Sequence, residues 1–369
     1  PGRDKDCKIR KKIKGVDLFF GIEDLVLLPK WLSQLNSVLS VKNFDNLKNY
    51  LSITPRSSSK FQSFVTIQTG CNNFCAYCVV PYARGREKNR TLKDILAEIK
   101  LLAKNGCVEI TLLGQVVNNY KILDRDNISK SNPFVYSHKH ECSGDDDFAI
   151  LLWEINQIME IKRIYFTAPD ARYFTDAQIK ALTLPKMGNF LHLPIQSGDN
   201  EILKKMNRKY TSEQYMTLIK KIRKAKPDIA LGTDIIVGFP GETKARFNHT
   251  LDLYKKCQFD ISYPAKYSQR SGTVAERAFE DNVSLVEKKR RWQVVQDLME
   301  EIVFKKNQKY LNKEIEVLVD DYRAGVCSGR TGEQKFAQFL GGKNLIGKLI
   351  KIKINFVGVW LLKGVICEN

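Results

Sequence analysis

Apolar runs and amphipathic stretches alternate between residues 61 and 268. Short runs rich in β-branched and aromatic residues, typical of strands, occupy residues 64–70, 108–114, 163–168, 190–198, 229–239 and 259–268. Stretches with apolar residues at helical spacing lie between them, at 91–105, 148–159, 175–183, 212–226 and 244–257. Strands that alternate with helices indicate parallel βαβ units. Six units are too few for an eightfold barrel, so we predict an α/β fold with an open (β/α)6 barrel over residues 61–305.

The residues before this region follow a different pattern. Residues 15–21 predict one strand and residues 25–35 a short helix. The polar, proline-containing stretch 52–60 predicts a linker. We therefore expect residues 1–60 to be the remnant of a partial N-terminal α/β domain, followed by a linker.

The C-terminal part predicts a second small domain. A long basic helix is expected from Ser284 to Leu311. Strand-like runs with glycine turns follow at 314–322, 335–340 and 349–366. We predict a small β-barrel over residues 306–369.

Residues 121–147 form a long polar connection inside the predicted barrel. Loops of this length are functional or mobile in most compact domains. His138, His140 and Cys142 in this connection are metal-ligand types, but the sequence offers no clear fourth partner, which favours a surface loop.

Charge and composition narrow the class of protein. The chain has 369 residues, 60 Lys and Arg against 41 Asp and Glu, and a net charge of +19. This excess favours a polyanionic partner such as nucleic acid, although a generally basic surface would look the same. No apolar run is long enough for a membrane span, so we expect no membrane partner.

Nine cysteines are an odd number in a chain of this length. Disulfide frameworks belong to small secreted domains, so we expect a reduced, cytoplasmic protein. Six cysteines are scattered, at positions 7, 107, 142, 257, 327 and 367. The other three fall within eight residues.

This cluster is the stretch GCNNFCAYC at residues 70–78, with thiols at Cys71, Cys75 and Cys78. Four thiolates would complete a structural zinc site, whereas three leave one metal position open for an external ligand. The cluster follows the first predicted strand, and barrel enzymes carry their chemistry at the C-terminal ends of strands. A zinc site with Cys107 or Cys142 as fourth ligand is the alternative.

The spacing C-x3-C-x-aromatic-C after the first strand resembles the signature of radical S-adenosylmethionine enzymes. Four stretches are similar to the methylthiotransferases of that superfamily, in particular to the branch that makes 2-methylthioadenosine in tRNA. They are GCNNFCAYCVVPYARGREKNR (70–90), TLLGQVVNNY (111–120), LHLPIQSGDNEILKKMNRKYT (191–211) and TDIIVGFPGET (233–243). The terminal β segment resembles the TRAM domain, a small RNA-binding barrel. The resemblance runs from about residue 16 to the C-terminus.

The resemblance implies the cofactors and their ligands. Cys71, Cys75 and Cys78 would hold a 4Fe–4S cluster, and S-adenosylmethionine would bind its open iron. One electron, from a donor such as flavodoxin or ferredoxin, would cleave this cofactor to a 5′-deoxyadenosyl radical. The residues that would contact S-adenosylmethionine are Tyr77, Gln115, Gln196, Ser197, Asp234 and Gly238.

The resemblance also implies a tRNA partner, bound through its anticodon stem-loop. Arg84, Arg86 and Arg90 follow the cysteine cluster and are candidate phosphate contacts. Arg323, Arg330 and Lys335 in the terminal barrel lie beside Phe336 and Phe339, a composition that suits unstacked RNA bases. A charge run on a solvated surface is the alternative for the arginines, and a place in the barrel core is favoured for the two phenylalanines.

The chain departs from the family pattern at several positions. The family carries a second 4Fe–4S cluster on three earlier cysteines, but only Cys7 precedes Cys71 here, so no ligands for that cluster are found. Val116 stands where Asn is usual, Asp170 where His is usual, and Ala265 where an aromatic residue is usual.

The predicted function is a tRNA methylthiotransferase that adds a methylthio group to carbon 2 of N6-isopentenyladenosine next to the anticodon. Two alternatives remain at this point. One is the same radical chemistry on another substrate, such as a ribosomal protein or threonylcarbamoyladenosine in tRNA. The other is a catalytically impaired tRNA-binding homologue that lacks the auxiliary cluster.

Overall fold

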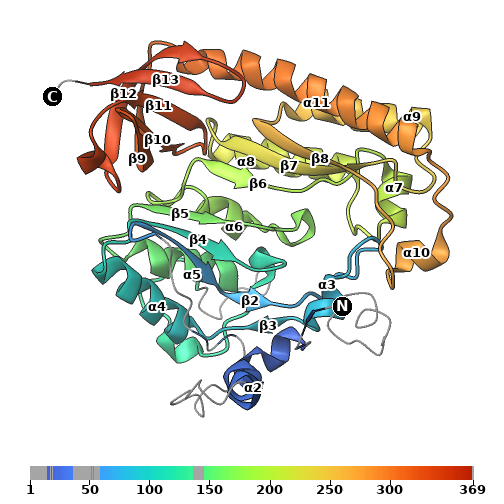
Figure 1. The fold of residues 1–369 in the computed structure, drawn as a ribbon, viewed down its shortest axis with the longest axis horizontal. Coiled ribbons are helices and arrows are strands. Elements are labelled where there is room, and N and C mark those ends of the chain that lie inside the picture. Colours follow the sequence, from blue (N-terminus) through green and yellow to red (C-terminus); the bar gives the residue numbers. More distant parts are fainter. Residues whose placement is uncertain are drawn as a thin grey trace.

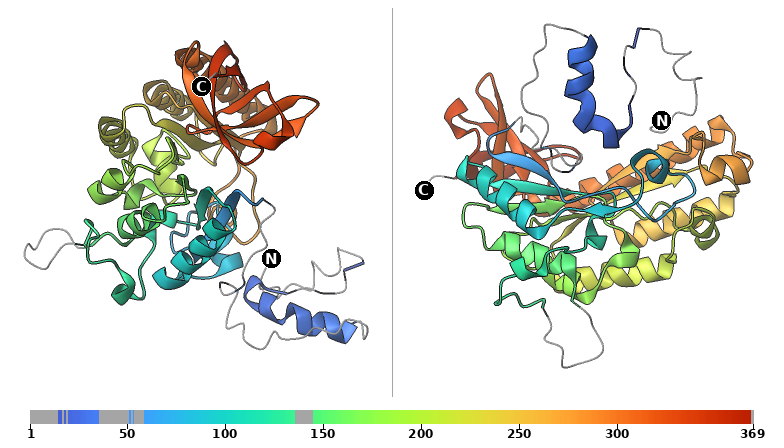
Figure 2. Two further views of the ribbon diagram at one scale, coloured as in Figure 1. Left: turned by 90° about the vertical axis from the view of Figure 1, so that its left-hand side faces the viewer. Right: turned by 90° about the horizontal axis from the view of Figure 1, so that it is seen from below.

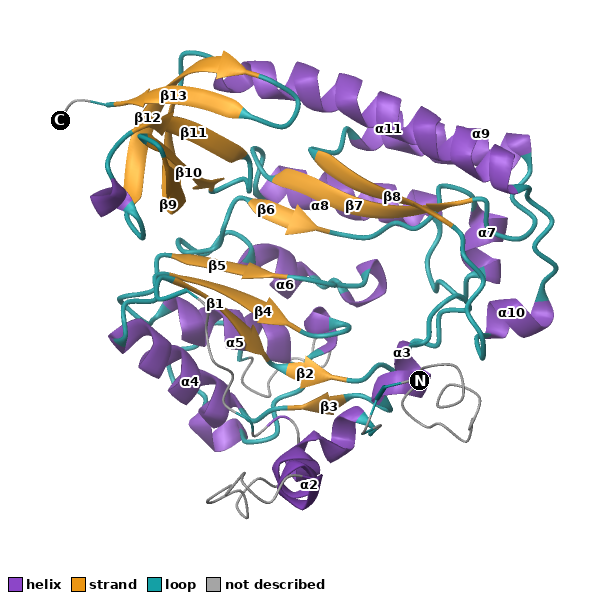
Figure 3. Ribbon diagram, viewed as in Figure 1, coloured by secondary structure: helices purple, strands orange, loops and turns teal. Residues whose placement is uncertain are grey.

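The computed structural model describes residues 15, 16, 18, 20–35, 51, 53, 59–135 and 145–367. Six parallel strands follow one another across the middle of the molecule (Figure 1). Helices cover their outer side, and a small barrel stands beside one end of the strands (Figure 3).

The first half of the strands forms a three-stranded parallel sheet. Its members are β1 (Gln62–Thr66), β4 (Glu109–Leu113) and β5 (Arg163–Phe166), in the order β1-β4-β5. Val65 pairs with Leu112, and neighbouring residues continue this register along both strands.

The second half is a separate parallel sheet of three strands. It contains β6 (Phe190–His192), β7 (Ala230–Val237) and β8 (Ile261–Lys266), in the order β6-β7-β8. One parallel bridge between Ile164 and Met187 connects the two halves. The strands thus run in one direction and in chain order, which confirms the predicted α/β class.

The helices between the strands begin at polar caps. They are α4 (Leu92–Lys104), α5 (Asp147–Asn156), α6 (Asp176–Ala181), α7 (Asn200–Lys205), α8 (Ser212–Ala225) and α9 (Lys244–Cys257). Each accepts a backbone N–H on a threonine or aspartate N-cap, at Thr91, Asp146, Thr175, Asp199, Thr211 and Thr243 respectively. Such caps satisfy donors that the first helical turn leaves without a partner.

The hydrophobic core lies between the strands and these helices. Leu92, Ile95 and Ile99 form the fully buried face of α4, at the spacing that the sequence predicts. They belong to one cluster with Val65 of β1 and Ile110 of β4. Helix packing therefore covers one side of the sheet and leaves the other side for the interior of the fold.

Several shorter elements complete this region. They are β2 (Gln68–Thr69), α3 (Val80–Arg84), β3 (Lys88–Asn89), α10 (Val274–Ala278), and the 3-10 turns Val117–Asn119, Arg125–Asn127 and Ala171–Tyr173. Before them, a 3-10 turn (Ile22–Leu27) leads into α2 (Leu28–Leu35), at the periphery of the molecule (Figure 2).

The C-terminal region is a long helix followed by a closed barrel. Helix α11 (Leu285–Asn307) leads through 3-10 turn Gln308–Tyr310 into the barrel. The barrel strands are β9 (Glu314–Arg323), β10 (Val326–Thr331), β11 (Phe336–Leu340), β12 (Leu349–Val357) and β13 (Leu362–Ile366), with a 3-10 turn at Lys343–Leu345. They close in the order β10-β11-β13-β12-β9, which confirms the predicted small barrel.

Arg163 joins the barrel to the parallel strands. This side chain, 7% exposed, donates to the carbonyl oxygens of Arg330 and Glu316, both at 3.0 Å. It also pairs with the carboxylates of Glu316 at 3.0 Å and Glu109 at 3.8 Å. One buried guanidinium thus satisfies acceptors from both parts of the protein.

The sequence-based elements agree with the structure in most places. The predicted strand at 15–21 is wrong, because the described residues there lie outside any strand. The single apolar run 349–366 is two strands, β12 and β13, that pair with each other around a turn. The sequence pattern does not predict strand β10, which contains few apolar residues. The predicted domain boundaries at residues 60 and 305 stay predictions.

The long connection at 121–147 is partly ordered by packing. Phe134 is buried in the core, and Asn132 donates to the Glu154 carboxylate of α5 at 3.0 Å. His138, His140 and Cys142 lie outside the described residues. Within the described part of the chain, no helix is both long and apolar enough to cross a membrane.

Replacing Arg163 with methionine should lower the free energy of unfolding by about 3 kcal/mol, because buried acceptors lose their charged donor. Urea denaturation measures this difference. The control is Lys221→Met, since Lys221 pairs with Asp176 on an exposed helix surface. It should change the value by less than about 0.5 kcal/mol. Equal effects of the two substitutions would contradict the assigned role of Arg163.

Candidate functional site

A two-stranded ribbon holds the cysteine loop at the end of the first strands. β2 and β3 pair antiparallel, with Gln68 opposite Asn89 and Thr69 opposite Lys88. Gly70 follows at a positive φ of 75°, and a Cβ there would lie 2.1 Å from the carbonyl oxygen of Arg86. Only glycine fits this close approach. The ribbon and this glycine therefore fix where the loop leaves the sheet.

The three thiols lie on one short, anchored loop. Cys71 is buried, while Cys75 and Cys78 are half-buried, and all three are free. Backbone N–H groups donate to two of the sulfur atoms, from Asn73 to Cys71 at 3.4 Å and from Val80 to Cys78 at 3.5 Å. Such donors stabilise thiolates that bind metal.

Burial is the main influence on the thiols. It raises the pKa of Cys71 to about 11, against a smaller lowering by the Asn73 N–H, and the neighbouring Cys75 and Cys78 add to the rise. Burial likewise raises the pKa of Cys78. The metal-free thiols of Cys71 and Cys78 are therefore protonated at neutral pH. Iron would displace those protons, since the thiolate is the ligand.

A buried arginine contacts the middle cysteine. Arg208, which follows α7, donates from Nη1 to the Cys75 sulfur at 3.5 Å and pairs with Asp170 at 3.3 Å. Its Nε donates to the Tyr210 hydroxyl at 2.9 Å. The pKa of Arg208 is raised despite burial, because Tyr210 and Asp170 favour its charged form. The loop therefore faces a fixed positive charge.

Asn73, between the first two cysteines, is held from several directions. Its amide donates to the Asp170 carboxylate at 3.0 Å, and its side-chain oxygen accepts from the Arg172 guanidinium and the Tyr173 hydroxyl. The Asn207 amide donates to the backbone carbonyls of Asn73 and Phe74. Residues that follow β5 and α7 thus clamp the cysteine loop.

Three thiols on one loop can supply three of the ligands of a cubic iron–sulfur cluster. Among the described residues, no three His, Cys, Asp or Glu side chains group closely enough for one metal ion. In a four-iron cluster each thiolate binds a different iron, so the sulfurs stand further apart than the ligands of a single ion. Three free thiols on one loop, with N–H and guanidinium donors to their sulfurs, suit that arrangement.

Two predicted cofactor contacts show features of a ligand site. The buried Oε1 of Gln115 has no hydrogen-bond partner, which is a cost unless a ligand supplies a donor. Gln196 adopts a positive φ of 70°, and its backbone bridges to β7 through Asp234 and Ile236. Strained backbone of this kind is concentrated at functional sites.

Other predicted contacts are occupied within the protein. Ser197 is fully buried, and its hydroxyl lies 3.4 Å from that of Thr250 and accepts from the Asp199 N–H. Asp234 lies on β7, where its carboxylate pairs with His192 at 3.1 Å and is 40% exposed. Tyr77 packs partly against a small core, and burial raises the pKa of its hydroxyl.

Gly238 lies in a turn that packs against α11. A Cβ at this position, whose φ is 72°, would come 2.3 Å from Cγ of Lys288. The Gly238 N–H donates to the Glu242 carboxylate, which pairs with Arg291 of α11 at 2.8 Å. The structure thus gives this glycine a packing role in the stretch Gly238–Glu242.

The basic residues after the cysteines differ in their surroundings. Arg84 is half-buried at the end of α3, and Arg86 is exposed. Arg90 is committed internally, since it donates to the Thr66 carbonyl at 2.8 Å and pairs with Glu98 at 2.5 Å. Arg86 is therefore the most accessible of the three predicted phosphate contacts.

The three basic residues of the C-terminal barrel also differ. Arg323 is 87% exposed and pairs with Asp321. Arg330 is exposed and lies over the Phe336 ring at 5.4 Å. Lys335 instead donates to the Asp260 carbonyl at 3.0 Å, and burial lowers its pKa to about 8. Phe339 belongs to the barrel core as predicted, whereas Phe336 is half-buried at the edge of a cavity.

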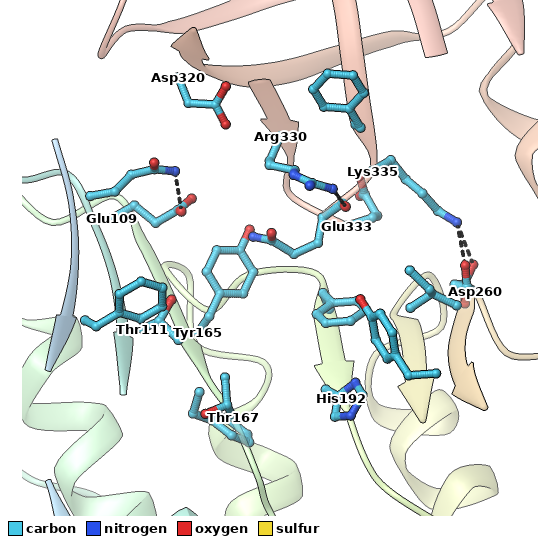
Figure 4. A pocket seen from close by; sticks show the side chains of 18 of the residues that line it. Glu109, Thr111, Tyr165, Thr167, His192, Asp260, Asp320, Arg330, Glu333 and Lys335 are labelled. Carbon is cyan, nitrogen blue, oxygen red and sulfur yellow. Dashed lines mark hydrogen bonds and ion pairs between the residues drawn. The ribbon is translucent and has the colours of Figure 1, made fainter. Parts of the chain in front are cut away.

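A cavity of about 710 Å³ lies between the parallel strands and the barrel (Figure 4). Glu109, Thr111, Tyr165, Thr167 and His192 line it from the strands, and Asp320, Arg330, Glu333 and Lys335 line it from the barrel. Two aromatic side chains in its wall, Phe64 and Tyr263, are 64% and 54% exposed. The cavity therefore has flat apolar surfaces and charged groups.

The basic run around Arg208 predicts a solvated helix surface, but Arg208 is buried and lies after α7, and the sequence does not predict the roles of Asn73 and Asp170. Asn73 and Arg208 lie inside stretches that resemble the family, and Asp170 stands where His is usual. Asn73 lies 97 residues from Asp170 in the sequence and Arg208 lies 133 residues from Cys75, so these contacts are invisible before folding.

The model of the radical SAM superfamily matches residues 65–254. A tRNA-2-methylthio-N(6)-dimethylallyladenosine synthase from Thermoanaerobacter sp. (strain X514) is 40% identical over 368 residues, which cover 98% of this chain and 74% of that protein. The synthase of the same name from Acetivibrio thermocellus is 40% identical over 363 residues, covering 96% and 72%.

Solved structures are more distant. Coproporphyrinogen III oxidase from Escherichia coli, described as a radical SAM enzyme, has a TM-score of 0.45 and 15% sequence identity. The match covers 66% of this chain and 53% of that one. A likeness this low adds nothing to the assignment from sequence.

Alanine at Cys71, Cys75 or Cys78 should reduce the iron retained after anaerobic reconstitution from about four atoms per chain to a small fraction of that. Iron and sulfide assays with visible absorbance measure this loss. The control is Cys107→Ala, because Cys107 is a buried thiol that donates to the Glu109 carbonyl. Full iron in any variant of the first three would contradict the assignment, as would its loss in the control.

Proposed function

The chain belongs to the radical SAM superfamily and, within it, to the tRNA-2-methylthio-N(6)-dimethylallyladenosine synthases, and from this premise we propose its mechanism. It is a tRNA methylthiotransferase. Its substrate is the N6-dimethylallyladenosine (isopentenyladenosine) beside the anticodon, which gains a methylthio group at carbon 2. The alternatives, another substrate or a binding protein without catalysis, are not favoured by this membership.

Cys71, Cys75 and Cys78 would hold the 4Fe–4S cluster, and S-adenosylmethionine would be its partner in the reaction. Together these groups supply one-electron cleavage of the cofactor and hence a radical that abstracts hydrogen. The protein contributes the surroundings. The Asn73 and Val80 N–H groups and the Arg208 guanidinium donate to the three sulfurs, so the loop is organised before iron arrives.

The loops at the C-terminal ends of the strands would bind S-adenosylmethionine. Gln115 contributes a side-chain oxygen that lacks a donor, and Gln196 contributes backbone in a strained conformation. Asp234 offers an accessible carboxylate beside His192. Ser197 and Gly238 are buried and Tyr77 is half-buried, so these three residues would support the cofactor site through packing.

The cavity between the strands and the barrel would receive the target nucleoside. Its volume of about 710 Å³ accommodates a flipped nucleoside, and the accessible rings of Phe64 and Tyr263 offer surfaces for stacking. Removing a base from its stack costs a few kcal/mol, and the cost is lowest in a single-stranded loop. An anticodon loop is such a substrate.

The C-terminal barrel would act as a TRAM-like RNA-binding domain beside an open (β/α)6 barrel. Arg323 and Arg330 are accessible cations of this barrel, and Arg86 is an accessible cation next to the cysteine loop. Together with the net charge of +19 they favour contact with phosphates. Lys335 and Arg90 take no part, because their charged groups already have internal partners.

Two requirements of the family reaction lie outside the described residues. The second 4Fe–4S cluster has no ligand set among them, and the electron donor is a separate partner such as flavodoxin or ferredoxin. The described part of the chain would supply radical generation and substrate binding, and formation of the methylthio product in cells tests whether it also supports sulfur insertion. The observation that carries the proposal is the 40% identity over 98% of the chain to a synthase of this name.

Expression of the chain in a bacterial strain that lacks its own synthase tests the function. The digested tRNA should then contain 2-methylthio-N6-isopentenyladenosine, measured by mass spectrometry, and the Cys75→Ala variant should yield only N6-isopentenyladenosine. The nucleoside must be absent from the parent strain for the comparison to count. If wild-type chain produces 2-methylthiolation of threonylcarbamoyladenosine or of a ribosomal protein instead, the substrate assignment is wrong.

Replacing Arg330 with alanine should weaken tRNA binding and make the slope of log Kd against log salt about one unit shallower, because one phosphate contact is lost. Fluorescence anisotropy with an anticodon stem-loop at several salt concentrations measures both quantities. Lys221→Ala on α8 removes the same charge from a distant surface and should leave the slope unchanged. An unchanged slope in Arg330→Ala would remove Arg330 from the interface.

A further inference from the structure

Asp170 is the point where three separate segments meet beside the cysteine loop. It follows β5 and is buried, with 6% of the residue exposed. Its backbone N–H donates to the Asn118 side-chain oxygen at 2.9 Å, and the Asn118 amide donates back to the Asp170 carbonyl at 3.1 Å. The segment after β4 therefore holds the Asp170 backbone in place.

Both carboxylate oxygens of Asp170 are used. Oδ1 accepts from the Arg172 N–H at 3.0 Å. Oδ2 accepts from the Asn73 amide at 3.0 Å and lies 3.3 Å from Nη1 of Arg208. One oxygen thus joins the cysteine loop, through Asn73, to the buried arginine.

The same Arg208 nitrogen lies between the carboxylate and a sulfur atom. Nη1 is 3.3 Å from the Asp170 carboxylate and 3.5 Å from the Cys75 sulfur. The arginine and aspartate side chains are 7% and 8% exposed, so little water screens their charges. The Cys75 sulfur therefore experiences a guanidinium whose charge is largely balanced by Asp170.

We propose that Asp170 is a positioning residue that balances the charge of Arg208 and thereby lowers the reduction potential of the cluster held by Cys71, Cys75 and Cys78. The inference rests on the proposed function only in that it requires the cluster. Asp170 also holds Asn73, whose N–H donates to the Cys71 sulfur. It therefore sets both the electrostatics and the shape of the loop.

The direction follows from charge. Reduction adds one negative charge to the cluster, so a nearby cation favours the reduced form and a nearby anion disfavours it. Hydrogen bonds to the sulfurs and net charge are the known determinants of such potentials. Asp170 compensates the cation that contacts Cys75, and its presence should therefore make the cluster harder to reduce and a stronger reductant.

A purely structural ion pair is the competing explanation. Removing one member of a buried pair is destabilising wherever it occurs, because the other charge loses its partner. Stability alone cannot separate the two explanations. The reduction potential can, because it responds to charge beside the sulfurs and is insensitive to a distant loss of stability.

The experiment is a spectroelectrochemical titration of the reconstituted chain, followed by electron paramagnetic resonance of the reduced cluster. In Asp170→Asn, which keeps the size of the side chain, the midpoint potential should move in the positive direction. Asp170→His introduces the residue that is usual in the family at this position, and it should also move the midpoint potential in the positive direction. This variant takes the place of Asp170→Asn if Asp170→Asn does not fold. Asp170→Glu keeps the charge and should restore most of the wild-type potential.

The matched control is Asp260→Asn. Asp260 is also a buried carboxylate, paired with Lys306 at 2.5 Å, but it precedes β8 at the opposite end of the strands. This variant should lose stability and keep the wild-type potential. Arg208→Met removes the cation and should move the potential in the negative direction. The double variant Asp170→Asn/Arg208→Met should fall between the two single variants.

The outcomes separate the two proposals. A wild-type chain that retains no iron refutes the cluster and with it the proposed function. Full iron in Asp170→Asn with an unchanged potential refutes the inference alone. Equal shifts in Asp170→Asn and Asp260→Asn also refute it, because the effect would then follow stability and not position. Opposite shifts for Asp170→Asn and Arg208→Met support it.

Discussion

The contact between Arg208 and the cysteine loop is the interaction on which the site depends. The three free thiols of this loop accept hydrogen bonds from the Asn73 and Val80 N–H groups and from the Arg208 guanidinium. Arg208 places a buried positive charge beside Cys75, and the Asp170 carboxylate offsets the cost of burying that charge. The shape of the loop therefore depends on side chains that follow β5 and α7.

The parallel strand order makes this convergence possible. The ends of β1, β5 and β6 lie at the same edge of the fold, so the segments after them share one space. The ribbon of β2 and β3 holds the cysteine loop, residues 170–173 hold Asn73, and Asn207 holds the loop backbone. Three segments that are distant in sequence therefore hold the same short cysteine loop in place.

The opposite end of the strands serves a different purpose. Arg163 and Lys335 tie the C-terminal barrel to β4, β5 and β8 through carbonyl and carboxylate acceptors. The attachment encloses a cavity with exposed aromatic rings and charged groups (Figure 4). The cysteine loop would then generate the radical at one end of the strands, and the C-terminal barrel would bind RNA at the other end. A flipped base would lie between them, in the interior of the fold.

The sequence by itself determined the alternating strands and helices, the three cysteines and the family. Each is a local pattern: hydrophobic period, N-cap residues such as Thr91 and Thr211, and a fixed spacing of thiols. It did not determine strand β10, whose pairing with β9 and β11 stabilises a run with few apolar residues. Nor did it show that Arg90 and Lys335 are already paired internally, while Arg86 and Arg330 are accessible. Only tertiary structure decides such matters, because the partner of a buried charge is chosen by the fold and can lie anywhere in the chain.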